Sequence, residues 1–503
     1  MNRLIPILIA LLVGLSSCSD SNDTPDPDVP TPGALNRYLC LNVAVAGGRE
    51  SRAEDGTTAG EDEGYDPEHT IRNNENMVSA ITAIIYPASA DINNDESANT
   101  TTVRAFSWKV TASKYTGTQP TDFTTGPRLL PSDLSEGDYK LLVIANLDYA
   151  SVLDGQTLKS VRDRLYETLP YSSSSSDPDK AYDPLYTKNF IMTSIKEVKL
   201  SLYSAPANGG IGNTGNKGSQ NNPFVPDEDI QLDRLAARID LALEEKNRHE
   251  YTDSDGSKAY SYEYPVIDST GTTVGKFQLT HAMVFNISKN QFLFKHTSDA
   301  LNVDKLKVPG RETQAWNGGV LRATNYVVDP LIYFRNTAKD YIRKFFVYDF
   351  YHDCITANKV FLEKTCRVPN CEDNTRFDSW TDATNKQYRY YTIAYSAENT
   401  VMVEYQEAQE HLLRTAYLTG IRFYGIYNLD GGTPKYLAFD YFIRHSGTSG
   451  EVDTSQPMAY GVVRNNIYRV YINSIHSRKG DFFIMLNVDV LPWQKYTHSG
   501  IYM

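Results

Sequence analysis

Short apolar runs with strand character, separated by turn residues, constrain the fold of this chain more than any other feature. Val, Ile, Thr, Phe and the 35 tyrosines favour extended backbone, because branched and aromatic side chains pack well on a pleated surface. Clusters of Gly, Asn, Asp and Pro between the runs favour turns. Only Leu158–Leu169 has clear helical spacing. The pattern predicts an all-β fold with minor helix, built from antiparallel β-sandwiches.

The chain divides near residues 205–226, which are rich in Gly, Asn and Pro and have no apolar periodicity. A single core seldom serves more than about 250–300 residues, and this chain has 503. Strand-like runs lie on both sides of the break. We therefore predict two sandwich domains, at 53–226 and 227–493.

The N-terminus has the features of an export signal. Arg3 precedes an unbroken apolar run, Leu4–Leu15, which is shorter than the about 20 residues that span a bilayer. The run ends in Leu15-Ser16-Ser17-Cys18, which resembles a lipobox. We predict a signal peptide at 1–17 and a lipid on Cys18, so that the precursor is an outer-membrane lipoprotein. The alternative is an ordinary signal peptide that ends near a cysteine.

An isolated strand follows this signal. Residues 19–34 form a Pro/Asp/Thr tether with little apolar content, and the alternating segment Tyr38–Ala46 then predicts a strand. A polar stretch, Gly47–Gly64, interrupts the chain directly afterwards and contains Arg49 and Arg52. A strand between a tether and a protease-accessible loop is an unusual beginning for a domain.

Composition and cysteine spacing exclude several kinds of site. The net charge of −13 disfavours nucleic acid, whose binding needs a basic surface. Cys366 and Cys371 could form a disulfide in an oxidising compartment, or remain two free thiols. Their spacing does not fit a zinc site, so we predict no metal.

Sequence motifs give no catalytic assignment. The chain has no G-x-S-x-G, no H-E-x-x-H and no phosphate-binding glycine loop, so we predict no catalytic residues, no cofactor and no enzyme. A secreted hydrolase stays open as an alternative, because convergent geometry is invisible in one sequence. Glycan binding through exposed aromatic residues is another.

The C-terminal region resembles a known family. Gly461–Ile475 (GVVRNNIYRVYINSI) and Val488–Trp493 (VDVLPW) resemble the strands of the Bacteroidales fimbrillins. The likeness is strongest to the major shaft subunit of the short (minor) fimbria, a type V pilus. This resemblance implies two tandem transthyretin-like sandwiches and a structural role in a surface fimbria that supports adhesion and biofilm formation.

The resemblance also implies maturation by an Arg-specific protease. Arg52–Ala53 is the expected bond, with Arg49–Glu50 as the alternative. Cleavage would remove residues 18–52, a lipidated propeptide that carries the first strand. The N-terminal sandwich would then lack an edge strand, and the exposed edge would accept a strand from another subunit.

The expected donor strand is the C-terminal tail, 494–503. The residues that could offer side chains to the acceptor are Tyr496, His498, Ile501, Tyr502 and Met503. The implied partners are identical or related pilin subunits, anchor and tip fimbrial proteins, and the protease. For the tail, the alternative is an ordinary disordered C-terminus. For the whole chain, the alternative is a pilus tip or accessory adhesin, or a glycan-binding surface lipoprotein.

Overall fold

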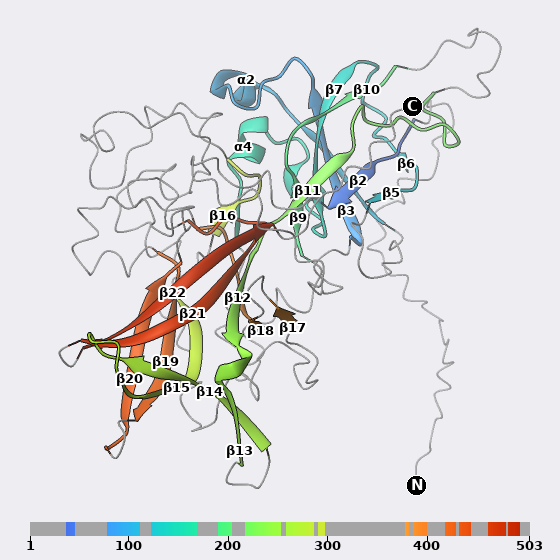
Figure 1. The fold of residues 1–503 in the computed structure, drawn as a ribbon. Coiled ribbons are helices and arrows are strands. Elements are labelled where there is room, and N and C mark those ends of the chain that lie inside the picture. Colours follow the sequence, from blue (N-terminus) through green and yellow to red (C-terminus); the bar gives the residue numbers. More distant parts are fainter. Residues whose placement is uncertain are drawn as a thin grey trace, which may run out of the picture.

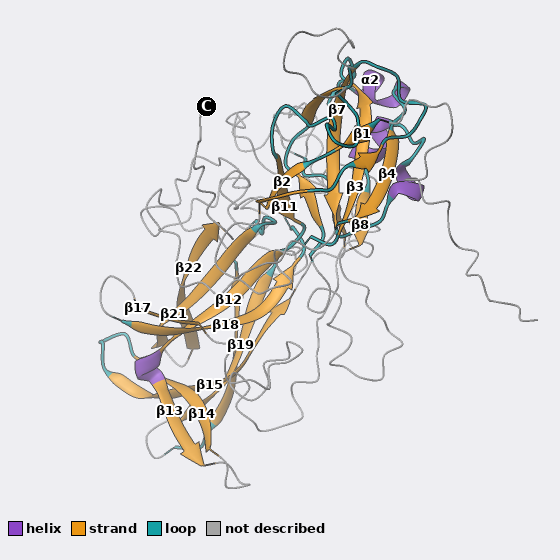
Figure 2. Ribbon diagram, turned by 90° about the vertical axis from the view of Figure 1, so that its right-hand side faces the viewer, coloured by secondary structure: helices purple, strands orange, loops and turns teal. Residues whose placement is uncertain are grey.

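A computed structural model describes the two parts of the chain that carry the sheets. The described residues are 37–45, 78–110, 122–167, 190–203, 217–252, 258–285, 290–296, 378–381, 386–399, 418–428, 432–443, 461–478 and 481–492. Within them, strands far outnumber three short α-helices and one 3-10 turn. The prediction of an all-β fold with minor helix is confirmed. Figures 1 and 2 show two bodies of sheet arranged end to end.

The N-terminal body is built on one large sheet. Its strands, in spatial order, are β4 (Arg104–Lys109), β3 (Ala80–Pro87), β7 (Asp138–Ala145), β9 (Met192–Ser194), β11 (Ile230–Arg234), β2 (Asn42–Val45) and β5 (Asp122–Thr124). The strand β10 (Val198–Ser201) pairs with β7, and a two-stranded sheet joins β1 (Tyr38–Leu39) to β6 (Arg128–Leu129).

Both faces of the central strands β3 and β7 are buried, which explains their nearly continuous apolar sequences. Ile81, Ala83 and Ile85 face the core that also contains the first strands. Ile84 and Tyr86 face a second cluster, formed by the helices α2 (Asp95–Thr100), α3 (Ala150–Leu153) and α4 (Leu158–Arg162). Short helices therefore cover one face of this sheet.

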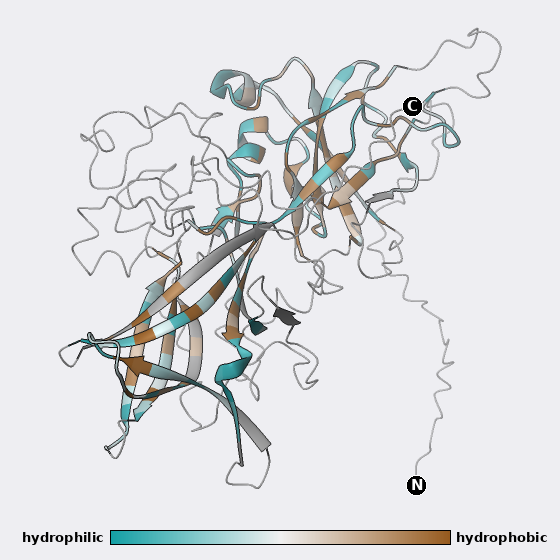
Figure 3. Cartoon of the chain, in the orientation of Figure 1, coloured by the Kyte–Doolittle hydropathy of each residue, from teal (hydrophilic) through white to brown (hydrophobic). Residues whose placement is uncertain are grey.

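The C-terminal body is a sheet of ten strands. Its main path is β17 (Asp378–Thr381), β18 (Gln387–Ser396), β12 (Ala237–Glu244), β21 (Asn466–Arg478), β14 (Lys258–Ile267), β15 (Thr273–Phe285), β19 (Gly420–Asn428) and β20 (Lys435–Phe442). β13 (Arg248–Thr252), which follows the 3-10 turn Glu245–Asn247, pairs with β14, and β22 (Asp481–Pro492) pairs with β21. Figure 3 shows hydrophobic and hydrophilic segments alternating along strands such as β21.

The sheets are mixed, whereas the sequence predicted antiparallel pairing throughout. Most pairs are antiparallel, but β2 runs parallel to β11, and β21 runs parallel to both β12 and β14. The first half of β21 pairs with β12 and its end pairs with β14, so this one strand spans the length of the body. Hydrophobic alternation is the same in both pairing modes and cannot distinguish them.

The chain crosses between the two bodies at Leu235 and Ala236. β11 lies beyond residue 226 and pairs with β2 and β9 of the N-terminal sheet, and β12 begins the C-terminal sheet directly after the crossing. A second connection is a two-stranded sheet of β8 (Leu165–Glu167) and β16 (Asn290–Phe292).

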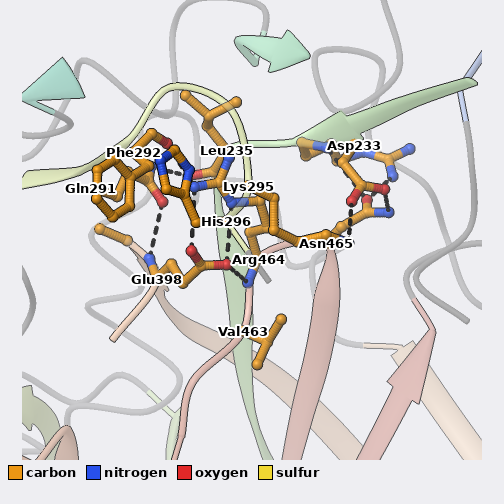
Figure 4. Close-up of polar contacts among 12 residues, drawn as sticks. Asp233, Leu235, Gln291, Phe292, Lys295, His296, Glu398, Val463, Arg464 and Asn465 are labelled. Carbon is orange, nitrogen blue, oxygen red and sulfur yellow. Dashed lines mark hydrogen bonds and ion pairs between the residues drawn. The ribbon is translucent and has the colours of Figure 1, made fainter. Parts of the chain in front are cut away.

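Arg464 holds this junction together. Its guanidinium is completely buried and makes two bonds to the Glu398 carboxylate, with Nε–Oε2 at 3.1 Å and Nη2–Oε1 at 3.2 Å. It also donates to the carbonyls of Phe292 and Leu293, at 2.6 Å and 3.1 Å. Figure 4 shows this arrangement around the segment that follows β16. A buried guanidinium needs such a full set of acceptors, because loss of water is costly for a charge.

Asn465 turns the chain into β21. Its backbone has φ 62°, in the left-handed region that Asn tolerates better than most residues, and its N–H donates to the carbonyl of Ala236 at 2.7 Å. The Arg-Asn sequence therefore places a buried cation and a left-handed turn at the crossing between the bodies.

His296 is a buried titratable group beside the same junction. Its ring stacks on Phe292 with centroids 3.8 Å apart, and its Nε2 lies 3.5 Å from Oδ1 of Asp163. Burial lowers the pKa of His296, although the bond to Asp163 opposes this shift. The bonds that Asp163 accepts from His296, Arg162 and Lys159 hold the pKa of its own carboxyl well below the usual range, even though burial opposes them.

Replacing Glu398 by Ala should lower the free energy of unfolding by about 3–5 kcal/mol, because it leaves the buried Arg464 cation without its carboxylate. Chemical denaturation would measure the change. The matched control is Asp440→Ala, which breaks the part-exposed Arg422–Asp440 pair on β19 and β20 and should cost about 0–1 kcal/mol. Equal effects of the two substitutions would contradict the role of Arg464.

Stability should fall as the pH drops below about 6.5, the usual pKa of an unfolded histidine. Because the pKa of His296 is lower in the folded chain, the unfolded chain binds the proton first as the pH falls, and this binding stabilises the unfolded state. This loss of stability stops below the pKa of His296 in the folded chain, because both states then bind the proton. Thermal melts between pH 7 and pH 5 should show a smaller decrease for His296→Gln than for the wild type. An identical decrease would show that His296 does not titrate on unfolding.

Candidate functional site

The first strand of the described chain lies inside the N-terminal body with neighbours on both edges. We call residues 37–45 the N-terminal strand, and the space it fills the slot. One wall of the slot is formed by residues 217–224 and β11, and the other by residues 122–130, which include β5 and β6. Figure 1 shows β2 between β11 and β5.

The wall formed by 217–224 and β11 runs parallel to the N-terminal strand. Tyr38 N–H donates to the carbonyl of Gly218, and the N–H of Phe224 donates to the carbonyl of Tyr38, both at 2.8 Å. Cys40 N–H donates to the carbonyl of Phe224, also at 2.8 Å. Farther along, Val43 lies opposite Ile230 and Val45 opposite Leu232.

The opposite wall is antiparallel and contains a specific side-chain contact. Thr125 N–H donates to the carbonyl of Leu41 at 2.8 Å, and Leu41 N–H donates to the Thr125 hydroxyl at 2.9 Å. The Cys40 thiol donates to the carbonyl of Thr125 at 2.7 Å, and burial raises the pKa of this thiol. Thr125 therefore satisfies backbone groups at the step between β1 and β2.

Alternate side chains of the N-terminal strand complete the core. Leu39, Leu41, Val43 and Val45 are 0–1% exposed and belong to the same cluster as Ile81, Val143 and Phe224. The opposite face is also covered, since Ala44 is 1% exposed. Removing this strand would take four core side chains from the N-terminal body.

Removal would also release one wall. Within the described part of the chain, β5 pairs only with β2, and β6 pairs only with β1. The N-terminal strand thus holds residues 122–130 to the rest of the sheet. A replacement strand would have to bond to both walls.

Gly218 is required where residues 217–224 approach the N-terminal strand. Its φ of +95° lies in the left-handed region, and the Phe224 ring covers it so closely that an added Cβ would lie 2.5 Å from that ring. The sequence suggested only a linker at 205–226, but its last part forms a wall of the slot. The one indication in the sequence that this part packs against a core was Phe224, an apolar residue among Gly, Asn and Pro.

Most of the predicted site residues lie outside the described part of the chain. These are Cys18, Arg49, Glu50, Arg52, Ala53, Cys366, Cys371, Tyr496, His498, Ile501, Tyr502 and Met503. Of the predicted segments, the structure places the removable strand, 38–46, as far as Val45. The residues that sequence reasoning missed are those of the walls, chiefly Thr125, Gly218 and Phe224.

The described ranges contain neither a metal-binding cluster nor a helix that could span a membrane. No group of three or more His, Cys, Asp or Glu side chains among them is placed to hold a metal ion. None of the helices in these ranges is long and apolar enough to cross a membrane. The slot is therefore the candidate functional site.

The fold and the slot define a mostly antiparallel β protein of two bodies, the first of which is completed by an N-terminal strand. No protein-family model and no curated protein matches the chain. Three solved structures with similar chain paths come from Bacteroidales. One is a candidate cell adhesion protein from Parabacteroides distasonis, with 12% identity, a TM-score of 0.40, and coverage of 92% of this chain and 98% of that one.

The second is the tip fimbrial protein Mfa3 from Porphyromonas gingivalis, with 12% identity, a TM-score of 0.32, and coverage of 90% and 99%. The third is a candidate cell adhesion protein from Bacteroides eggerthii, with 10% identity, a TM-score of 0.38, and coverage of 91% and 96%. All three are described as cell adhesion or fimbrial proteins.

Replacing Gly218 by Ala should destabilise the protein by about 2–5 kcal/mol, because left-handed strain adds to overpacking against Phe224. The matched control is Gly155→Ala. Gly155 has φ +75° but no atom within 4 Å of an added Cβ, so only strain of about 1–2 kcal/mol applies. Urea unfolding followed by tyrosine fluorescence would measure both. A Gly218 variant no less stable than the Gly155 variant would contradict the packing of this wall.

Proposed function

We propose that this chain is a structural subunit of a surface fimbria of the type V pilus class, which polymerises by donor-strand exchange. The precursor is exported as a lipoprotein through Cys18 and cleaved after Arg52, or after Arg49. The mature subunit supports adhesion and biofilm formation at the cell surface. Its partners are other pilin subunits, anchor and tip fimbrial proteins, and an Arg-specific protease.

One observation carries the proposal. The N-terminal strand bonds to neighbours on both edges and contributes four core side chains, yet only a short polar stretch with two arginines separates it from the rest of the chain. A strand that completes a core but is followed directly by two arginines can be removed by one Arg-specific cut. Its removal would create a site for β-strand addition with unpaired backbone on two walls.

The slot sets requirements for the strand that replaces the N-terminal strand. To reproduce the bonds it must run parallel to β11 and antiparallel to β5. Its alternate side chains would enter the core at the positions that Leu39, Leu41, Val43 and Val45 now fill. A small residue is needed at the position of Ala44, which is almost fully covered.

The donor strand in this proposal is the C-terminal tail, 494–503, of a neighbouring subunit. Tyr496, His498, Ile501, Tyr502 and Met503 supply its larger side chains. Because donor and slot are different surfaces, each contact leaves a free slot and a free tail at opposite ends. Such heterologous contacts do not close and build a filament.

The proposal predicts the first residue of the assembled form. Filaments sheared from the cell surface should contain chains that begin at Ala53, or at Glu50 if the alternative bond is cut. N-terminal sequencing would establish this. If every surface chain began at Cys18, cleavage and strand removal would be excluded.

Two variants distinguish cleavage of the precursor from donation of the C-terminal tail. Replacing both Arg49 and Arg52 by Gln should leave full-length lipoprotein without filaments. Arg37→Gln changes only the first residue of the N-terminal strand, before both cleavage sites, and should assemble normally. Deleting 494–503 should give a processed, folded subunit that does not polymerise. Normal filaments from the deletion variant would refute the tail as donor. A processed chain found only at filament ends would instead identify a tip or accessory adhesin.

A further inference from the structure

Three side chains with complementary chemistry meet at the junction between the two bodies. Asp233 belongs to β11, Lys295 follows β16, and Asn465 precedes β21. The Asp233 carboxylate bridges the other two: its Oδ2 lies 3.2 Å from Lys295 Nζ, and its Oδ1 accepts a bond of 2.8 Å from Asn465 Nδ2. A primary amine and a carboxamide are thus bound to the two oxygens of one carboxylate (Figure 4).

The cluster is shielded from water. The side chain of Asp233 is 2% exposed and that of Lys295 is 8% exposed, while Asn465 is completely buried. Exclusion of water strengthens electrostatic effects and protects an amide from hydrolysis.

A cation polarises the carboxamide. Nη1 of Arg234 donates to Oδ1 of Asn465 at 2.7 Å, and the Arg234 side chain is completely buried. A buried guanidinium at this oxygen would stabilise the negative charge that develops when a nucleophile adds to Asn465 Cγ. The cluster therefore contains every group that amide formation needs. These groups are an amine nucleophile (Lys295), a proton carrier (Asp233), a carboxamide electrophile (Asn465) and a cation at its oxygen (Arg234).

We propose that Lys295 and Asn465 join in an intramolecular amide cross-link, with Asp233 as the proton carrier. Asp233 takes a proton from Lys295, and the neutral amine attacks Asn465 Cγ while the carbonyl electrons move to Oδ1. The C=O bond then re-forms, the Cγ–Nδ2 bond breaks, and Nδ2 leaves as ammonia with the proton returned by Asp233. The second proton of the new amide nitrogen passes through Asp233 to ammonia, so one ammonium ion is released and no redox partner is needed.

The bond would link the segment after β16, which contains Lys295, to the turn before β21, which contains Asn465. β16 pairs with β8, and Asn465 lies beside the crossing at Ala236. The cross-link would therefore span the junction covalently. It does not depend on the proposed fimbrial function, because it requires only folding.

Mass spectrometry of the purified full chain tests this proposal. The intact mass should be lower than that of the unlinked chain by one ammonia molecule. Trypsin should yield a branched peptide that joins Asn290–Lys305, uncut at Lys295, to Asn465–Arg469. Quantitative recovery of the linear peptides Asn290–Lys295 and Asn465–Arg469 from folded wild-type protein would overturn the proposal. Loss of ammonia without this branched peptide would overturn it as well.

Variants assign the roles. Lys295→Arg and Asp233→Asn should each abolish the branched peptide completely. Asn466→Ala is the matched control, because the Asn466 amide donates to the carbonyls of Val463 and Arg464 and its loss should leave the cross-link intact. Full cross-linking in Asp233→Asn would refute Asp233 as the proton carrier. Because the wild-type spectrum alone decides whether the bond forms, a misfolded variant does not obscure the result.

Discussion

The N-terminal body depends on the need of an internal strand to satisfy its backbone groups on both edges. Residues 37–45 meet this need through two different walls, one parallel and one antiparallel. Every unpaired group left by their loss would cost free energy if it stayed buried. The same residues fill the core with Leu39, Leu41, Val43 and Val45. Hydrogen bonding and packing therefore make one short segment essential to the stability of the N-terminal body.

The slot and the junction between the bodies share β11. Its first three residues, Ile230–Leu232, pair with the N-terminal strand, and its last two, Asp233 and Arg234, contact Asn465. The core around the N-terminal strand also contains Tyr395 and Ile467 of the C-terminal sheet. Packing is continuous from the slot to the buried Arg464, so the two bodies meet through a core and not through a flexible linker.

Local sequence predicted the strands well but could not predict their partners. The runs expected at Tyr139–Asn146 and Ile467–Ile475 correspond to β7, which ends at Ala145, and to β21, because apolar and branched residues suffice to predict a strand. The helix expected at Leu158–Leu169 ends at Arg162, because Leu165–Glu167 pairs with β16 more than a hundred residues later. The wall residues Thr125 and Gly218 act through contacts distant in sequence. The buried role of Arg464 and Asn465 was equally hidden, although their block carried the family resemblance.

The parallel pairing of β2 with β11 fixes a direction. A strand that satisfies the donors and acceptors of Gly218, Phe224 and Thr125 can enter in only one orientation, since reversing it would misplace every bond. A fibre assembled through this slot is therefore polar, with all subunits pointing the same way. Under the proposed function its two ends would differ chemically, because one would present an empty slot and the other the segment 494–503.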